Sequence, residues 1–188
     1  MTDTLFTRTP RSEIDAPWQP AWDMLHKLTG DATFVEVFAQ APQMLEFVMQ
    51  QFYARVFFGG TVDQRYKQLA RLTLSLSHGC RTCNKQNIPG AIEAGFTTAQ
   101  IEALKDGRKE SFAPADRAVI EYAEQVALSN MEGRMTPALY GNLRAHFSEA
   151  QILELGTAMA VISGMAKLSF VLDLVERESY CPFTTAAA

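Results

Sequence analysis

The chain has 188 residues, of which 47% are apolar and 20% charged; this is the balance of a folded domain and excludes an intrinsically disordered chain. Its formal net charge of −4 excludes an overall basic surface for nucleic acid. Three cysteines are too few for the disulfide framework of a small secreted protein.

Apolar residues recur at helical spacing along the chain, and no segment shows the sustained alternation of a strand. We predict one all-α domain, a helical bundle with short loops, over residues 21–176. An N-terminal arm at 1–20 precedes it, and a tail at 177–188 follows. The predicted helices span 20–29, 33–41, 43–58, 62–78, 80–94, 98–105, 114–129, 137–146 and 149–175.

Three segments place a hydroxyl residue three positions before a glutamine: 61–64, 97–100 and 148–151. This spacing predicts capping boxes, in which each side chain bonds the other residue's free backbone N–H at a helix start. Trp18 in the arm and Trp22 just after it are large apolar side chains, so we expect them to be buried against the chain's own domain or against a partner subunit. The similarity of the second and third segments indicates either shared capping chemistry or a duplicated helical unit.

The most apolar region, 152–172, is interrupted by Glu154 and Lys167, with only 12 uncharged residues between them. A bilayer-spanning helix needs about 20 apolar residues, so we expect a buried core helix. The N-terminus lacks the charged lead and apolar core of a signal peptide. We therefore expect a cytoplasmic protein without a membrane or nucleic-acid partner.

Cys80 and Cys83 form a C-x-x-C pair that we predict in the first turn of a helix. Free N–H groups and the helix dipole lower a thiol pKa at such a position. Between Gln64 and Ile92 there are five basic residues and no acidic one, which also favours the reactive thiolate. These residues are Arg65, Lys67, Arg71, Arg81 and Lys85.

Two other interpretations of the pair stay open at this point. Both cysteines can be inert small hydrophobes in a core. A zinc site would need four ligands, and the remaining candidates stand singly along the chain, so we predict neither a metal nor a cofactor. The remaining candidate ligands are His26, His78, His146 and Cys181. Cys181 lies in the predicted tail, where its thiol would pair with another subunit or with nothing.

The segment "QLARLTLSLSHGCRTCNKQNIPGAIEAGFTTAQIEAL" resembles the AhpD-like (alkylhydroperoxidase D) and carboxymuconolactone decarboxylase superfamily, and the similarity extends over about residues 40–175. The resemblance implies an AhpD-like all-helical fold in homo-oligomers, trimers or hexamers. It also implies peroxide reduction, with Cys83 attacking the peroxide, Cys80 resolving the product as a disulfide, and an external thiol or dithiol supplying electrons.

The chain departs from that family at two positions. The family's catalytic glutamate and histidine, which transfer protons, correspond to Gln68 and Asn87. Neither amide side chain accepts a proton near pH 7. His78 either supplies a base from another direction or is a surface histidine at a helix end. Asn87 is either a polar site residue or a cap where Pro89 breaks the helix.

From the cysteine pair we predict a thiol-dependent oxidoreductase, and the resemblance implies the alkylhydroperoxidase type. Its site residues are Cys83, Cys80, Gln68, Asn87 and His78. One alternative is a non-catalytic or redox-sensing protein, since the proton-transferring residues are replaced. The other is a lyase on a small organic acid, as in the decarboxylase members of the superfamily.

Overall fold

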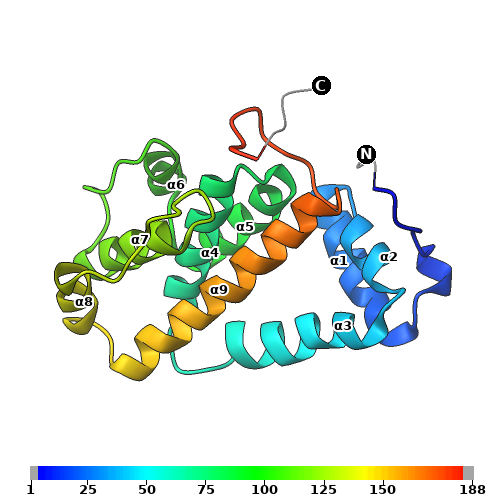
Figure 1. The fold of residues 1–188 in the computed structure, drawn as a ribbon, viewed down its shortest axis with the longest axis horizontal. Helices are drawn as coiled ribbons and strands as arrows, with labels where there is room; N and C mark the ends of the chain where they lie inside the picture. Colours follow the sequence, from blue (N-terminus) through cyan, green and yellow to red (C-terminus); the bar gives the residue numbers. More distant parts are fainter. Residues whose placement is uncertain (1–3, 184–188) are drawn as a thin grey trace.

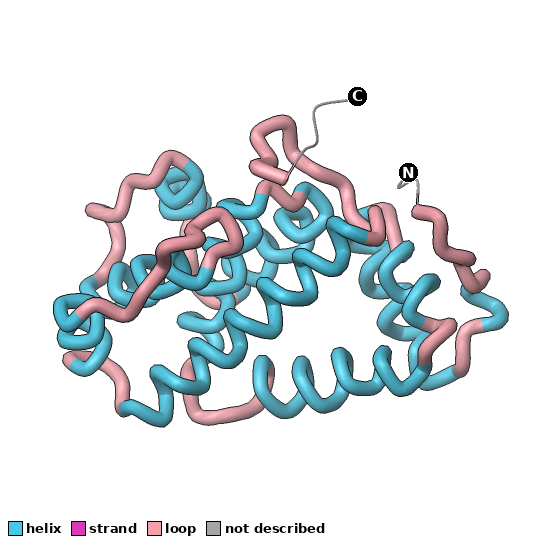
Figure 2. The backbone as a smooth tube through the Cα atoms, viewed as in Figure 1, coloured by secondary structure: helices cyan, strands magenta, loops and turns pink. Residues whose placement is uncertain are grey.

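The computed structural model describes residues 4–183, and the predicted all-α fold is confirmed: these residues form helices and loops, with no strand among them (Figure 2). Two short 3₁₀-helices, Arg11–Glu13 and Ala16–Trp18, precede the longer elements. These are α1 (Gln19–Thr29), α2 (Thr33–Phe38), α3 (Pro42–Glu46), the π-helix η3 (Phe47–Phe57), α4 (Gln64–His78), α5 (Arg81–Glu93), α6 (Thr98–Lys105), α7 (Pro114–Val126), α8 (Pro137–Arg144) and α9 (Glu149–Val171).

Helix α4 is the centre of the bundle, because it packs against α5, α7 and α9. Figure 1 shows α9 crossing the molecule diagonally, with α6, α7 and α8 at one end and α1 and α2 at the other. The apolar face of α4, including Leu69, Leu72 and Leu76, is buried in the main core. A helix enclosed on several sides in this way gives the residues that it carries fixed positions.

The N-terminal arm packs on its own chain. Trp18 and Trp22 join an apolar cluster with Ile14, Val35 and Leu45. The indole Nε1 of Trp22 donates to Glu36 Oε1 at 2.8 Å, which satisfies the one polar atom of that ring. The burial expected of these tryptophans therefore takes place within the chain.

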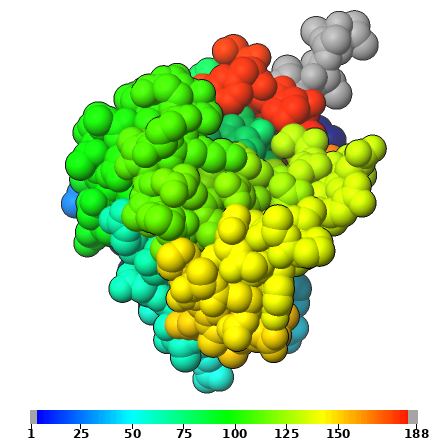
Figure 3. Space-filling view, turned by 90° about the vertical axis from the view of Figure 1, so that its left-hand side faces the viewer, coloured from blue at the N-terminus to red at the C-terminus, as the bar shows by residue number. Residues whose placement is uncertain are grey.

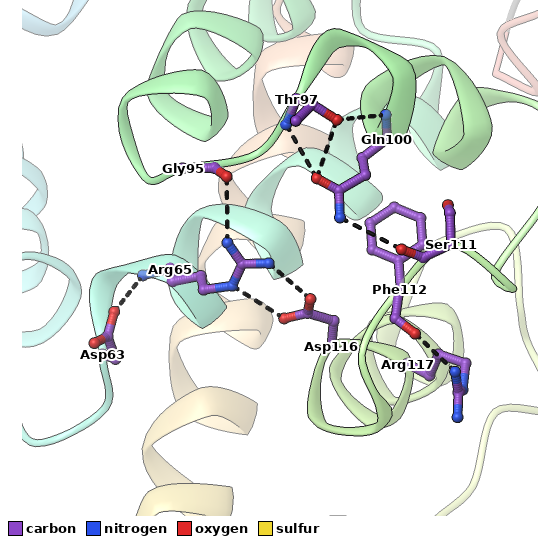
Figure 4. Close-up of polar contacts among 9 residues, drawn as sticks. All are labelled: Asp63, Arg65, Gly95, Thr97, Gln100, Ser111, Phe112, Asp116 and Arg117. Atoms are coloured by element: carbon purple, nitrogen blue, oxygen red, sulfur yellow. Dashed lines mark hydrogen bonds and ion pairs between the residues drawn. The ribbon is translucent and has the colours of Figure 1, made fainter.

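Two of the three predicted capping boxes are confirmed, at the starts of α6 and α9. Figure 4 shows the first of them, with Thr97 and Gln100 bonded to each other's backbone N–H groups. The predicted box at 61–64 is wrong, because Asp63 caps α4 instead. The Thr61 hydroxyl donates to Glu154 on α9 at 2.8 Å, so a contact distant in sequence replaces the local one.

The helix predicted over 43–58 is present, but only α3 is an α-helix and the chain continues as the π-helix η3. Such wide helical turns occur often at functional sites. At the end of η3, the buried ammonium group of Lys67 donates to the carbonyl oxygens of Val56 and Gly59. The same group forms an ion pair with Glu154 Oε1 at 2.6 Å, which joins η3 and α4 to α9.

Within residues 4–183, α9 alone is long and apolar enough to cross a membrane by length and composition. It packs against α4, α7 and η3, but only 33% of its apolar stretch is buried, less than expected of a core helix, and it ends at Val171 rather than at 175. Leu153, Leu168 and Val171 on its outer face are exposed. Figure 3 views the molecule onto the end formed by α6, α7 and α8, with the start of α9 below them and the C-terminal segment above.

Candidate functional site

Cys80 and Cys83 lie at the start of α5 and are joined by a disulfide, with their Cα atoms 5.2 Å apart. Gly79 makes this placement possible, because it takes the left-handed conformation (φ +62°) that ends α4. A Cβ atom at this glycine would stand 2.5 Å from the Cα of Cys181. Cys80 is fully buried, whereas Cys83 is half-buried, so only the second sulfur has access to a reactant.

A cavity of about 480 Å³ adjoins the disulfide, and Cys83 lines it while Cys80 does not. Its walls come from α1, α2, η3, α4, α5 and α9, and most of the lining side chains are apolar. A volume of this size suits a small organic molecule. The apolar lining includes Met24, Leu25, Leu28, Phe34, Val48, Met49, Phe52, Phe58, Ile162, Met165, Leu174 and Val175. The sequence did not indicate that the N-terminal helix α1 contributes to this wall.

Gln68 and Asn87 stand at the two positions where the resembling family has a glutamate and a histidine, and both line this cavity. They are 8% and 3% exposed, and neither amide oxygen has a hydrogen-bond partner among residues 4–183. Asn87 Nδ2 donates to the backbone carbonyl of Arg71 at 3.5 Å. An acceptor buried without a donor is costly, so both oxygens are suited to a donor group on a bound molecule or water.

The alternative that Asn87 caps a helix broken at Pro89 is wrong. Helix α5 continues without interruption from Arg81 to Glu93, with Pro89 inside it. The Asn87 side chain turns towards α4 instead. Its position one turn after Cys83 places both residues on one face of α5, which favours its interpretation as a polar residue of the site.

His78 lines the cavity but is not the surface histidine that one of the two interpretations expected. Only 1% of it is exposed, and its Nε2 accepts from the backbone N–H of Leu128 at 3.1 Å. Burial lowers the pKa of His78 to about 4, because desolvation disfavours the charged ring. The ring is therefore neutral at pH 7 with Nε2 occupied, and it is a poor general base for the disulfide.

The basic residues around the disulfide do not act as a combined positive field, contrary to our prediction. Four of the five form ion pairs with carboxylates outside the segment: Arg65 with Asp116 at 2.8 Å, Lys67 with Glu154 at 2.6 Å, and Arg81 and Lys85 with Glu178 and Glu176, each at 3.3 Å. Figure 4 shows the first pair, in which both oxygens of Asp116 face the guanidinium group. Arg71 is the one basic residue of the five that forms no ion pair with a carboxylate among residues 4–183.

Cys181 is a free cysteine and is buried. It packs in one apolar cluster with Cys80 and Phe170, and its thiol donates to the backbone carbonyl of His78 at 3.1 Å. The segment that carries it is fixed to α5, where the N–H of Arg81 donates to the carbonyl of Glu176 at 2.9 Å. Among residues 4–183, no three His, Cys, Asp or Glu side chains converge as metal ligands.

Three comparisons with known proteins bear on this arrangement. Residues 42–125 match the model of the Carboxymuconolactone decarboxylase family, and this range contains η3, α4, α5 and both cysteines of the disulfide. No curated protein matches the chain.

Two solved structures share the fold. One is a protein of unknown function from Agrobacterium tumefaciens, described as a candidate antioxidant defence protein AhpD. It is 20% identical with a TM-score of 0.63, over 72% of this chain and 91% of that one. The other is a cysteine-to-alanine variant of the debrominase Bmp8 in complex with 2,3,4-tribromopyrrole. It is 15% identical with a TM-score of 0.73, over 94% of this chain and 93% of that one. Residues 42–125 are thus similar in sequence to the Carboxymuconolactone decarboxylase family, and the chain has an AhpD-like fold.

Proposed function

We propose that this protein is a thiol-dependent oxidoreductase whose Cys80–Cys83 pair reduces a peroxide or disulfide substrate bound in the cavity. One observation carries the proposal. Cys80 and Cys83 are joined by a disulfide, and Cys83 lines the cavity while Cys80 is fully buried. A disulfide with one accessible sulfur is suited to thiol–disulfide exchange, in which a thiolate attacks and a second thiol resolves the product.

With a hydroperoxide, the reduced pair would act in two steps. The Cys83 thiolate attacks the terminal peroxide oxygen and breaks the O–O bond, which yields a sulfenic acid on Cys83 and, after protonation, an alcohol. The Cys80 thiol then attacks Cys83 Sγ, and water leaves as the disulfide forms. Two electrons pass from the two thiols to the peroxide. An external thiol or dithiol returns them and restores the reduced pair.

Gln68 and Asn87 would position the substrate or a water by hydrogen bonds, because neither amide transfers protons near pH 7. The neutral His78 ring has its Nε2 occupied and does not replace them. General acid–base assistance contributes about 10²–10⁴-fold to such reactions. We therefore expect slow turnover, with protons exchanged through solvent.

The assembly and the partners belong to the same proposal. The exposed apolar side chains of α9, such as Leu153 and Val171, would form part of a contact between copies in a trimer or hexamer. The electron donor would be a cytoplasmic thiol or dithiol. Sedimentation of the protein at several concentrations tests whether it forms a trimer or hexamer.

The test of the function is a thiol titration of the fully reduced protein before and after one equivalent of an organic hydroperoxide. The expected result is the loss of two thiols per chain, mapped by peptide mass spectrometry to a Cys80–Cys83 disulfide. Cys181→Ser is the matched control, since it removes the third thiol and should leave the reaction unchanged. If Cys80 and Cys83 stay reduced while peroxide persists, the protein is not a thiol peroxidase.

Reductive dehalogenation is a second candidate, favoured by the apolar cavity and by the fold shared with the debrominase over 94% of this chain. In the balanced reaction, two thiols and a bromoarene yield a disulfide, bromide, a proton and the arene, in which hydrogen replaces bromine. Bromide release from a bromopyrrole in the presence of a dithiol tests this candidate. Release that is absent with the wild-type protein, or undiminished in Cys83→Ser, would exclude it.

A further inference from the structure

We infer that Arg71 makes the cavity a binding site for apolar organic anions, with the acid group of the ligand on the Arg71 guanidinium. The inference rests on the proposed function in taking this cavity as the substrate site. It adds to that function a substrate class: an apolar molecule that carries a carboxylate or a similar acid group.

The first argument is that the charge of Arg71 is buried without a partner. Arg71 is only 6% exposed and lines the cavity. Within residues 4–183 its side chain forms no ion pair and no hydrogen bond, although the four other basic residues of the segment each have a carboxylate partner. An arginine stays protonated in proteins, and the nitrogens of Arg71 are not among the fully buried polar atoms that lack a partner, so they have access to the cavity that Arg71 lines. A ligand in the cavity can therefore supply the missing anion.

The second argument is that the guanidinium group is held in a defined position. Its central carbon lies 5.4 Å from the ring centroid of Tyr53 and 5.3 Å from that of Phe57, both on η3. These contacts fix the group by cation–π attraction but do not neutralise its charge. The five N–H donors of the planar group remain available for a carboxylate, which an arginine binds through two parallel hydrogen bonds.

The third argument concerns the orientation of the ligand. Asp31 and Glu93 also line the cavity, but neither forms an ion pair with Arg71. The unpartnered oxygens of Gln68 and Asn87 would repel a carboxylate and require a neutral donor instead. The acid group is therefore directed to Arg71. The apolar body of the ligand fills the rest of the cavity, and its neutral end is left for Cys83.

Calorimetric titration of the oxidised protein with octanoate and with 1-octanol tests the inference without any thiol chemistry. The two probes have the same chain length and differ in charge. We expect octanoate to bind about tenfold or more tightly than 1-octanol, although the alcohol is the more apolar. Equal or reversed affinities in the wild-type protein would overturn the inference.

Variants at Arg71 give the second measurement. Arg71→Met should weaken octanoate binding about tenfold or more and leave 1-octanol binding unchanged, whereas Arg71→Lys should retain an intermediate affinity for octanoate. Circular dichroism establishes that each variant is folded, and if Arg71→Met does not fold, the wild-type comparison decides. Octanoate binding that is the same in Arg71→Met as in the wild type would contradict the inference. A failed thiol titration with intact octanoate binding would reject only the proposed function.

Discussion

The Sγ atom of Cys80 caps the helix that carries Cys83: the backbone N–H of Cys83 donates to it at 3.2 Å. The cysteine that would resolve the reaction is thus also the N-cap residue of α5. The helix dipole at this helix start favours a thiolate in the reduced protein. The contribution of this capping bond to the free energy of unfolding can be measured apart from that of the disulfide.

We predict that, under reducing conditions, Cys80→Ser is more stable than Cys80→Ala. Serine is a preferred N-cap residue, and replacing a capping side chain by alanine costs about 1 kcal/mol. The free energy of unfolding of both variants, measured with urea in the presence of a reductant, gives the comparison. Neither variant can form the disulfide, so they are matched in that respect. Equal stabilities would show that the capping bond contributes nothing.

Burial of His78 predicts a pH dependence of stability. The unfolded chain binds a proton on this residue with a pKa near 6.5, but the folded protein does so only at about 4. Between these values the unfolded state binds more protons, so the free energy of unfolding falls as the pH is lowered from 6.5 to 4. The loss should reach about 3 kcal/mol at most.

His78→Gln is the matched variant, because its amide oxygen can still accept from the N–H of Leu128. Urea unfolding at several pH values should show a smaller decrease between pH 6.5 and 4 in this variant than in the wild type. Parallel curves for the two proteins would refute the assignment of the pH dependence to His78.

The ion pair between Lys67 and Glu154 predicts a second, more acidic dependence. Burial alone would raise the pKa of Glu154, but hydrogen bonds from Lys67, from the backbone and hydroxyl of Thr61, and from the backbone of Val62 together lower it to about 2 from a usual 4.5. The carboxylate therefore stabilises the fold fully above pH 4.5. This contribution is lost as the pH falls towards 2.

Glu154→Gln should lower the free energy of unfolding at pH 7 by about 3 kcal/mol, because it leaves the ammonium group of Lys67 buried without a carboxylate. The double variant Lys67→Met/Glu154→Gln should lose less than this, since the unpaired charge is gone. Thermal unfolding of the three proteins gives the comparison. A double variant less stable than Glu154→Gln would contradict this explanation.

Introducing the glutamate and histidine of the resembling family at positions 68 and 87 should accelerate peroxide reduction. In the double variant Gln68→Glu/Asn87→His, the rate of disulfide formation with a hydroperoxide should rise about 10²-fold or more. Stopped-flow thiol measurements on the reduced protein give this rate. The same substitutions on a Cys83→Ser background serve as the control and should show no reaction. An unchanged rate would mean that these two positions do not limit proton transfer.

Much of the fold was predictable from the sequence, because helix starts and ends are encoded locally. The capping boxes at Thr97 and Ser148 and the left-handed Gly79 depend on neighbouring residues alone. The box expected at Thr61 failed because Glu154, 93 positions away, binds that hydroxyl. The π-helical geometry of η3 could not be predicted from the spacing of apolar residues, because that spacing is compared with the 3.6 residues per turn of an α-helix.

The sequence predicted which residues lie at the candidate site, but it did not predict their ion pairs or their protonation. The alignment of the C-x-x-C motif identified Gln68 and Asn87, and both line the cavity. The sequence run of basic residues indicated a positive field, yet the partners of Arg65, Lys67, Arg81 and Lys85 come from residues 116–178, far along the chain. The isolation of Arg71 and the burial of His78 are likewise products of tertiary packing.

The most direct test of the central statement, that Cys83 is the reactive sulfur of a functional dithiol, is the alkylation rate of each cysteine in the reduced protein as a function of pH, read by mass spectrometry. We predict that Cys83 reacts first, with an apparent pKa below the value of about 8.5 for free cysteine, while Cys80 and Cys181 are protected by burial. Faster alkylation of Cys80, or a Cys83 that titrates like free cysteine, would contradict the account.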